Sequence, residues 1–185
     1  MSGELIFVDT ETTGLDHHRH AVWEVALVDV DGRVLLDCKC RLTAEQLAKA
    51  DGDALRVGSY YRRSVVGTVY ERETVAQRVA VLTEGRVLAG FNPSFDQAML
   101  AELLREAGLE PAWDYHVLAV EAYVAGALGL LGLAGGAVMS AKAVGVDPDS
   151  EGTRHTALAD ARLAARVFRV ASAIGSAKAE LEGAA

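Results

Sequence analysis

Two acids near the start of the chain, Asp9 and Glu11, stand two residues apart at the end of a short apolar run. In extended chain this spacing puts both carboxylates on one face, with Cα atoms about 7 Å apart. Such a pair suits joint chelation of a hard divalent cation, which would relieve the cost of burying two acids on an apolar strand. Two acids at an exposed strand end remain the alternative.

Two further motifs carry side chains of similar chemistry. Asp96 falls in the first turn of a predicted helix that follows a strand, where the helix dipole favours an anion; a simple helix-start acid fits it equally. His155 precedes Asp160 by five residues, a separation of about 140° in an ideal helix. We therefore expect His155 in the loop before a helix, Thr156 as its cap and Asp160 in its first turn, with both side chains facing one point.

The elements that must position these residues alternate between strand and helix. Asp31-Gly32 favours a hairpin turn, and Asn92 with Pro93 favours a helix start. Predicted strands are residues 4–9, 22–30, 33–42, 86–90 and 113–118. Predicted helices are residues 43–50, 74–83, 92–108, 119–127, 138–144 and 157–174, and residues 51–68 are predicted to form a surface loop. The pattern indicates a mixed α/β sheet covered by helices.

The length and composition of the chain limit the number of domains and the class of protein. The 185 residues suit a single domain, placed at 1–175, with residues 176–185 as a frayed tail. With 51% hydrophobic residues the chain is not disordered, and its net charge of −8 argues against a general coat for polyanions. The uncharged segment 122–141 is long enough to cross a bilayer, but its glycines favour a buried, loosely helical connection and no membrane span.

The cysteines and the first residues of the chain indicate the cellular compartment of the protein. Cys38 and Cys40 are expected to be reduced thiols, and no signal peptide precedes the first apolar run. We expect a cytoplasmic protein.

Taken together, the three motifs resemble the DEDD superfamily of 3′→5′ exonucleases over residues 5–168. The matching patterns, in order, are Asp-x-Glu-Thr-Thr-Gly, Asn-x-x-Phe-Asp and His-x-x-x-x-Asp. His155 lies five residues before the final acid, and Thr156 stands where a second subfamily has Tyr. The chain therefore resembles the His type, DEDDh, which includes the epsilon proofreading exonuclease of DNA polymerase III, ribonuclease T and oligoribonuclease. Phe91 departs from the pattern, because family members often have His there.

The resemblance implies a ribonuclease H-like fold with a mixed five-stranded sheet, in which a three-strand antiparallel meander is joined by two parallel strands. It implies a metal-dependent 3′→5′ exonuclease that uses two divalent cations, Mg²⁺ with Mn²⁺ able to substitute. Asp9, Glu11, Asp96 and Asp160 would be the metal ligands, and His155 would be the general base.

The implied substrate is a single-stranded 3′ end, with DNA favoured over RNA. Residues expected to meet it are Thr12, Thr13, Gly14, Asn92, Phe95, Tyr60, Arg62 and Arg63. In residues 51–68, arginine would contact the backbone and tyrosine would stack on bases, although a solvated loop fits equally. A polymerase or repair complex is the expected partner, and the chain would be a monomer or a homodimer.

Two other functions are alternatives to the exonuclease. The first is a non-catalytic ribonuclease H-like module that binds a nucleic-acid end or a protein. The second is a haloacid-dehalogenase-type phosphatase, in which an apolar strand ends in two aspartates; here Glu11 replaces the second aspartate, and no suitably placed lysine follows a later strand.

Overall fold

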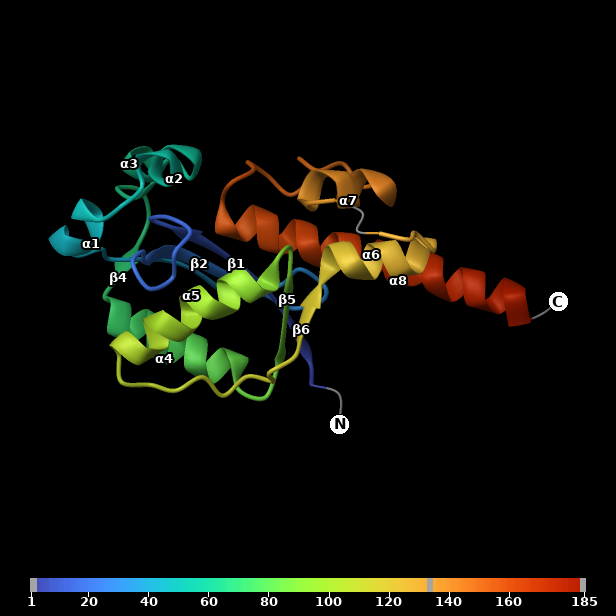
Figure 1. Cartoon of the computed structure of the whole chain (residues 1–185), viewed down its shortest axis with the longest axis horizontal. Helices are drawn as coiled ribbons and strands as arrows, with labels where there is room; N and C mark the ends of the chain where they lie inside the picture. The colour runs from blue at the N-terminus through green and yellow to red at the C-terminus, as the bar shows by residue number, and fades with distance from the viewer. Residues whose placement is uncertain (1–2, 133–134, 184–185) are drawn as a thin grey trace.

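A mixed sheet with helices on both faces forms the centre of the computed structural model, which describes residues 3–132 and 135–183 (Figure 1). Within those residues the sheet has six strands in the order β4-β3-β2-β1-β5-β6. Their bounds are β1 Leu5–Thr12, β2 Val22–Val28, β3 Val34–Cys40, β4 Val69–Tyr70, β5 Val87–Gly90 and β6 Val117–Ala119. The ribonuclease H-like α/β class predicted above is confirmed.

Strands β1, β2 and β3 form the predicted antiparallel meander. The β2–β3 turn closes through the Asp29 N–H to the Arg33 carbonyl at 3.0 Å and the Gly32 N–H to the Asp29 carbonyl at 2.9 Å. Gly32 has a φ of +80°, which glycine adopts without steric cost. The Asp31-Gly32 signal for a hairpin is confirmed.

Parallel pairing extends the meander on both sides. Strand β5 lies beside β1, and β6 beside β5, as predicted. On the other edge the two-residue strand β4 pairs in parallel with β3, so the sheet has six strands where five were predicted. A two-residue strand is too short to show the alternation that marks a strand in sequence.

Residues 51–68, predicted to be a loop, form two short helices, α2 Gly52–Val57 and α3 Tyr60–Arg63. Asp51 starts α2, because its carboxylate accepts from the Asp53 N–H at 2.8 Å. The loop prediction was wrong because helices of six and four residues are too short for a clear apolar period.

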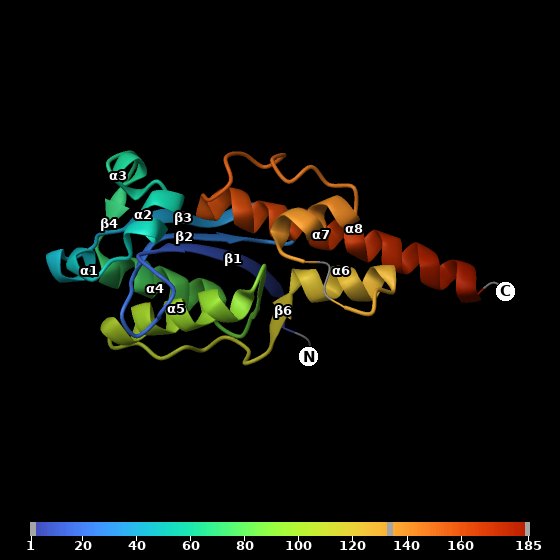
Figure 2. The same ribbon diagram turned by 45° about the horizontal axis from the view of Figure 1, so that its top comes forward.

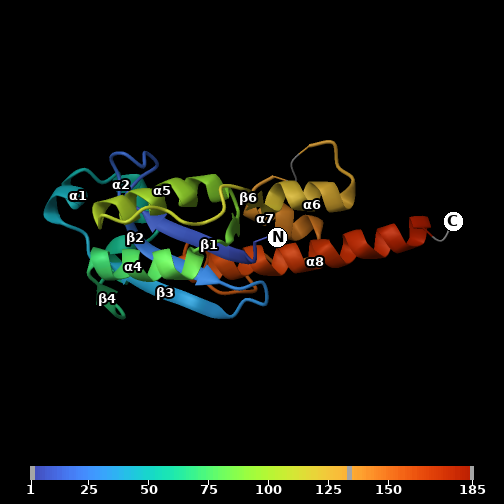
Figure 3. The ribbon, with the colours of Figure 1, turned by 90° about the horizontal axis from the view of Figure 1, so that it is seen from below.

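Longer helices cover the two faces of the sheet. Helices α4 and α5 lie on one face, and α6, α7 and α8 pack on the other (Figures 2 and 3). The remaining helix bounds are α1 Ala44–Ala48, α4 Arg72–Thr83, α5 Pro93–Glu106, α6 Val120–Leu128, α7 Ala137–Ala143 and α8 Ala157–Gly183. Helix α8 continues past residue 175, so residues 176–183 are helical where a frayed tail was expected.

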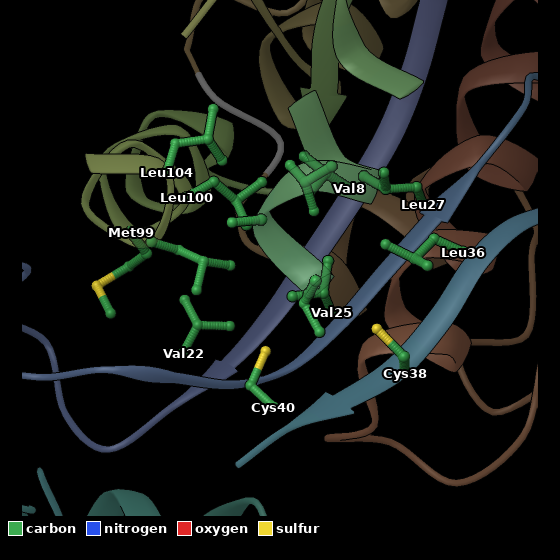
Figure 4. Packing of buried hydrophobic residues seen from close by; sticks show 14 of the residues in the cluster. Val8, Val22, Val25, Leu27, Leu36, Cys38, Cys40, Met99, Leu100 and Leu104 are labelled. Atoms are coloured by element: carbon green, nitrogen blue, oxygen red, sulfur yellow. The ribbon is translucent and has the colours of Figure 1, made fainter. Parts of the chain in front are cut away.

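Side chains of β1 alternate between two buried clusters. Ile6 and Val8 face α4 and α5, where they join residues such as Leu100 (Figure 4). Phe7 faces α8, and its ring lies 5.5 Å from the ring of Phe168. Because the strand has a period of two, Asp9 and Glu11 point to the α8 side.

The segment 122–141 covers most of α6, most of α7 and the connection between them, and it is buried only in part. Leu130 and Leu131 are exposed, and residues 133 and 134 lie outside the described part of the chain. Among the described helices, none combines the length and apolar character that a bilayer crossing requires.

Candidate active site

The carboxylates of Asp9, Glu11 and Asp160 meet where the end of β1 faces the start of α8. One oxygen from each of the three side chains lies within 4.8 Å of an oxygen from each of the others. Asp9 and Glu11 come from alternate positions of one strand, and Asp160 comes from a segment about 150 residues later. The structure thus brings together three of the four predicted metal ligands.

The start of α8 holds Asp160 and His155 as their spacing predicted. Thr156 caps the helix: its Oγ1 accepts from the Ala159 N–H at 3.3 Å. Asp160 lies in the first turn, where its Oδ2 accepts from the His155 N–H at 3.0 Å and its Oδ1 pairs with Arg154 Nε at 3.1 Å. His155 lies in the preceding loop with an exposed side chain and a φ of +60°.

Asp96 enters the site from α5. It is 3% exposed, and its Oδ1 accepts a hydrogen bond from Thr10 Oγ1 at 2.7 Å. Asn92 stands at the N-cap position of α5 as predicted, but it has a left-handed φ of +51° and its side chain makes no cap bond. Instead the Asn92 N–H donates to Glu121 Oε1 at 3.1 Å, which ties the loop to α6.

Burial and mutual repulsion make this group of acids hard to ionise. Desolvation raises the pKa of Asp9 well above its ordinary value, and the carboxylates of Asp96, Asp160 and Glu11 raise it further. Desolvation, with repulsion from Glu24, raises the pKa of Glu11 to about 8. Desolvation likewise raises the pKa of Asp96 to about 7. The positive charge of a bound divalent cation would offset both the desolvation and the repulsion, so the donor set fits such an ion.

The predicted substrate residues at the end of β1 are engaged with their own loop. Thr13 is fully buried, and its Oγ1 accepts from the Ala21 N–H at 2.9 Å. Thr12 Oγ1 donates to the Gly14 carbonyl at 2.8 Å. Phe95 is half-buried against the α4–α5 core. A role for these residues in substrate contact stays a prediction.

Helix α3 presents its predicted substrate residues in two directions. Tyr61 and Arg62 are exposed, and an open pocket of about 370 Å³ lies beside them. Tyr60 packs edge-on against Trp23, with ring centroids 5.2 Å apart. Arg63 turns inward, and its side chain is only 15% exposed. The pocket lining is Gly52, Leu55, Arg56, Ser59, Tyr61 and Arg62.

Two residues to which sequence reasoning assigned no role complete the site. Glu24 on β2 is 5% exposed and stands opposite Glu11 in the β1–β2 register. Gly58 lies so close that a Cβ placed there would be 2.7 Å from Glu11 Oε2. The signal for Glu24 was an acid inside an otherwise apolar strand, Val22–Val28. Gly58 gave no signal, because its contact is made across the fold.

A second group of possible metal ligands lies away from this centre. His18 Nδ1 is 3.7 Å from Glu102 Oε1, and His17 stacks on His18. His18 is largely exposed, and Glu102 already pairs with Arg105 at 2.7 Å. The partly buried carboxylates of β1 and α8 are therefore the better candidate for a catalytic centre.

Fold and site define a ribonuclease H-like α/β protein with a buried acidic centre. Residues 6–168 match a family model, RNase_T, described as exonuclease. The match spans most of the chain, and the chain belongs to this exonuclease family. It confirms the resemblance inferred from the three motifs.

Solved structures of similar fold include exonuclease I. One exonuclease I structure superposes with a TM-score of 0.72 at 16% identity, over 93% of this chain and 41% of that one. E. coli exonuclease I in complex with a dT13 oligonucleotide gives a TM-score of 0.72 at 16% identity, over 97% of this chain and 43% of that one. Its complex with a dA16 oligonucleotide gives 0.71 at 18% identity, over 93% and 41%.

The chain spans about two fifths of the length of these exonuclease I chains. At such identities the likeness shows the fold alone. No curated protein sequence matches the chain.

Proposed function

We propose that the chain is a metal-dependent 3′→5′ exonuclease that removes nucleotides from single-stranded ends, with DNA favoured over RNA. The observation that carries the proposal is the convergence of Asp9, Glu11 and Asp160 within 4.8 Å, with buried Asp96 beside them. Membership of the exonuclease family supports the activity, and relatives of similar fold were solved with single-stranded oligonucleotides.

The carboxylates of Asp9, Glu11, Asp96 and Asp160 would hold two divalent cations, and their oxygen donors suit Mg²⁺, with Mn²⁺ able to substitute. When bound, such ions neutralise charge on the phosphoryl group and lower the pKa of an attacking water. Bound cations would also offset the charge of the acids, so that an acidic protein can accept a polyanionic strand.

His155 is proposed as the general base of this reaction. Its side chain is exposed and its backbone N–H is bonded to Asp160, so the residue is next to the acidic centre in the fold. A neutral imidazole can accept the proton of the attacking water, because its ordinary pKa is near 6.5.

The groove beside α3 is the proposed path for the strand. Exposed Tyr61 offers a face for a base, and exposed Arg62 offers positive charge for a phosphate, beside a pocket of about 370 Å³. Arg62 supplies local positive charge in a chain whose net charge is −8.

Location and partners complete the proposal. Cys38 and Cys40 are free and buried, which suits a reducing cytoplasm, and burial raises the pKa of Cys38 to about 11. The chain would act as a monomer or a homodimer, alone or with a polymerase or repair complex.

A gel assay on 5′-labelled oligonucleotides tests the proposal. Wild-type protein with Mg²⁺ or Mn²⁺ should shorten the labelled strand stepwise from its 3′ end. EDTA should stop this shortening. Matched DNA and RNA strands with free or blocked 3′ ends measure substrate preference. Absence of EDTA-sensitive shortening on every strand would overturn the proposal.

A further inference from the structure

Arg63 forms hydrogen bonds and an ion pair with residues inside the protein. Its Nη1 donates to the Gly58 carbonyl and to the His155 carbonyl, both at 2.8 Å. Its Nη2 forms an ion pair with Glu24, and the guanidinium lies 5.1 Å over the Trp23 ring. The two charged side chains are 15% and 7% exposed.

Glu24 extends this network to α8. Its Oε2 also accepts from the Ala157 N–H, the first residue of that helix, at 3.1 Å. The backbone is therefore fastened on both sides of Thr156, at the His155 carbonyl by Arg63 and at the Ala157 N–H by Glu24. An anion at this end of a helix is also favoured by the helix dipole.

The backbone of this segment has an unfavourable conformation at His155. His155 has a φ of +60°, a left-handed conformation that is unfavourable for a residue other than glycine. Two hydrogen bonds fix it there, its carbonyl to Arg63 and its N–H to Asp160. Loss of the Arg63 bond would release one of the two.

We infer that Arg63 and Glu24 are positioning residues: their buried ion pair fixes the loop of His155 and the first turn of α8 against β2. The inference rests on the proposed function and replaces the expectation that Arg63 binds substrate. Arg62, its neighbour on α3, is exposed and is left to contact the strand. Misplacing a catalytic group by about 1 Å can cost 10²-fold in rate.

Three variants test the pair: Arg63→Gln, Arg63→Lys and Glu24→Gln, with Arg62→Gln as the matched control on the same helix. Arg63→Gln should lower kcat by about 10²-fold while KM changes less than about twofold. Arg63→Lys, which keeps the charge but not the fork of donors, should fall between it and the wild type. Arg62→Gln removes a proposed contact with the strand, so it should raise KM by a larger factor than it lowers kcat.

Hydrogen exchange supplies a readout that does not depend on activity. Amides of residues 153–160 should exchange faster in Arg63→Gln and Glu24→Gln and at the wild-type rate in Arg62→Gln. Should the wild type prove inactive, the proposed function fails, and this exchange pattern alone decides whether the pair holds the loop. Unchanged exchange, or a raised KM with wild-type kcat in Arg63→Gln, would overturn the inference. Should Arg63→Gln not fold, Arg63→Lys and Glu24→Gln decide the same comparison.

Discussion

Among single residues, Asp9 has the surroundings least favourable to a charge. Four other acids raise its pKa, because Asp96, Asp160, Glu11 and Glu24 all lie near enough to repel it. A residue so placed costs stability when ionised without a counter-charge, and such a cost is typical of functional sites. The proposed catalysis and folding would therefore make opposite demands on the carboxyl group of Asp9.

Asp9→Asn should separate these demands. Removal of one ligand charge should lower kcat by at least about 10³-fold, because a bound cation supplies several kcal/mol of transition-state stabilisation. In EDTA at pH 8 the same change should raise Tm, because it removes the repulsion. Exonuclease assays and thermal unfolding of Asp9→Asn and Asp160→Asn measure both effects; full activity of either variant would show that its carboxylate is not a ligand.

Gly58 is the residue whose lack of a side chain matters most to the site. A Cβ there would lie 2.7 Å from Glu11 Oε2 and 2.9 Å from Trp23 Cζ2, so Gly58→Ala should displace one of them. We expect a loss of about 1–3 kcal/mol in the free energy of unfolding and weaker Mn²⁺ binding, measured by denaturant titration and calorimetry.

Gly52→Ala is the control for Gly58→Ala. It lies at the start of α2, and a Cβ at Gly52 meets no atom within 4 Å. This substitution should be neutral or stabilising, by up to about 1 kcal/mol. Equal stability of the two variants would mean that α2 and α3 shift freely and do not confine Glu11.

Among the elements, helix α8 both packs on the sheet and contributes a carboxylate to the acid centre. It packs along the sheet through residues such as Phe168 and presents Asp160 from its first turn. The position of that carboxylate therefore depends on where the helix begins, which Thr156 sets.

Thr156→Ala should lose the cap bond to the Ala159 N–H and the bond that Thr156 Oγ1 donates to the Thr153 carbonyl. Caps of this kind contribute about 1 kcal/mol, so unfolding should become easier by about that amount. Thr156→Ser keeps the hydroxyl and should restore both stability and activity. Denaturant unfolding of the three proteins checks this; a serine variant as unstable as the alanine variant would contradict it.

Local sequence signals predicted the elements that carry the candidate site residues. Asp31-Gly32 gave the hairpin, Pro93 began α5, and the spacing of His155 and Asp160 placed one in a loop and the other in a helix. Each of these rests on the chemistry of a few adjacent residues. The acid centre followed from them once a family resemblance set the order of the motifs.

Contacts across the fold could not be predicted in this way. The pairing of β4 with β3, the inward turn of Arg63 and the approach of Gly58 to Glu11 depend on segments that meet only in three dimensions. The C-terminal part of α8 was missed because its Ala, Lys and Glu residues lack an apolar stripe, although all three are good helix formers.

For the whole molecule, the acid centre predicts how stability changes with pH in the absence of divalent cations. Burial raises the pKa of Glu11 from 4.5 to about 8 and that of Asp96 from 3.8 to about 7. The folded state therefore holds protons that the unfolded state has released, and this contribution to stability is lost as pH rises through the folded pKa values. In EDTA, Tm should fall between about pH 5 and pH 8, by about 2–4 °C for each kcal/mol lost in a chain of this size.

The acids whose pKa values are lowered do not obscure this window. Asp29 and Asp114 have lowered pKa values, so they are ionised in both states above about pH 5. A Mn²⁺ concentration of 100 times its dissociation constant at pH 8 should add about 2.7 kcal/mol of stability at that pH. The same Mn²⁺ concentration should add less at pH 5, because protons compete for the carboxylates and weaken binding.

The variant Glu11→Gln tests whether the acid centre causes this dependence of Tm on pH. Without an ionisable group at residue 11, the fall of Tm between pH 5 and pH 8 should shrink, and the stabilisation by Mn²⁺ should shrink with it. Glu45→Gln is the control, because Glu45 lies exposed on α1 and pairs with Lys49 across one helical turn. A wild-type Tm in EDTA that rises from pH 5 to pH 8 would mean that the acids are not crowded, and the physical basis for the cation site would be lost with it.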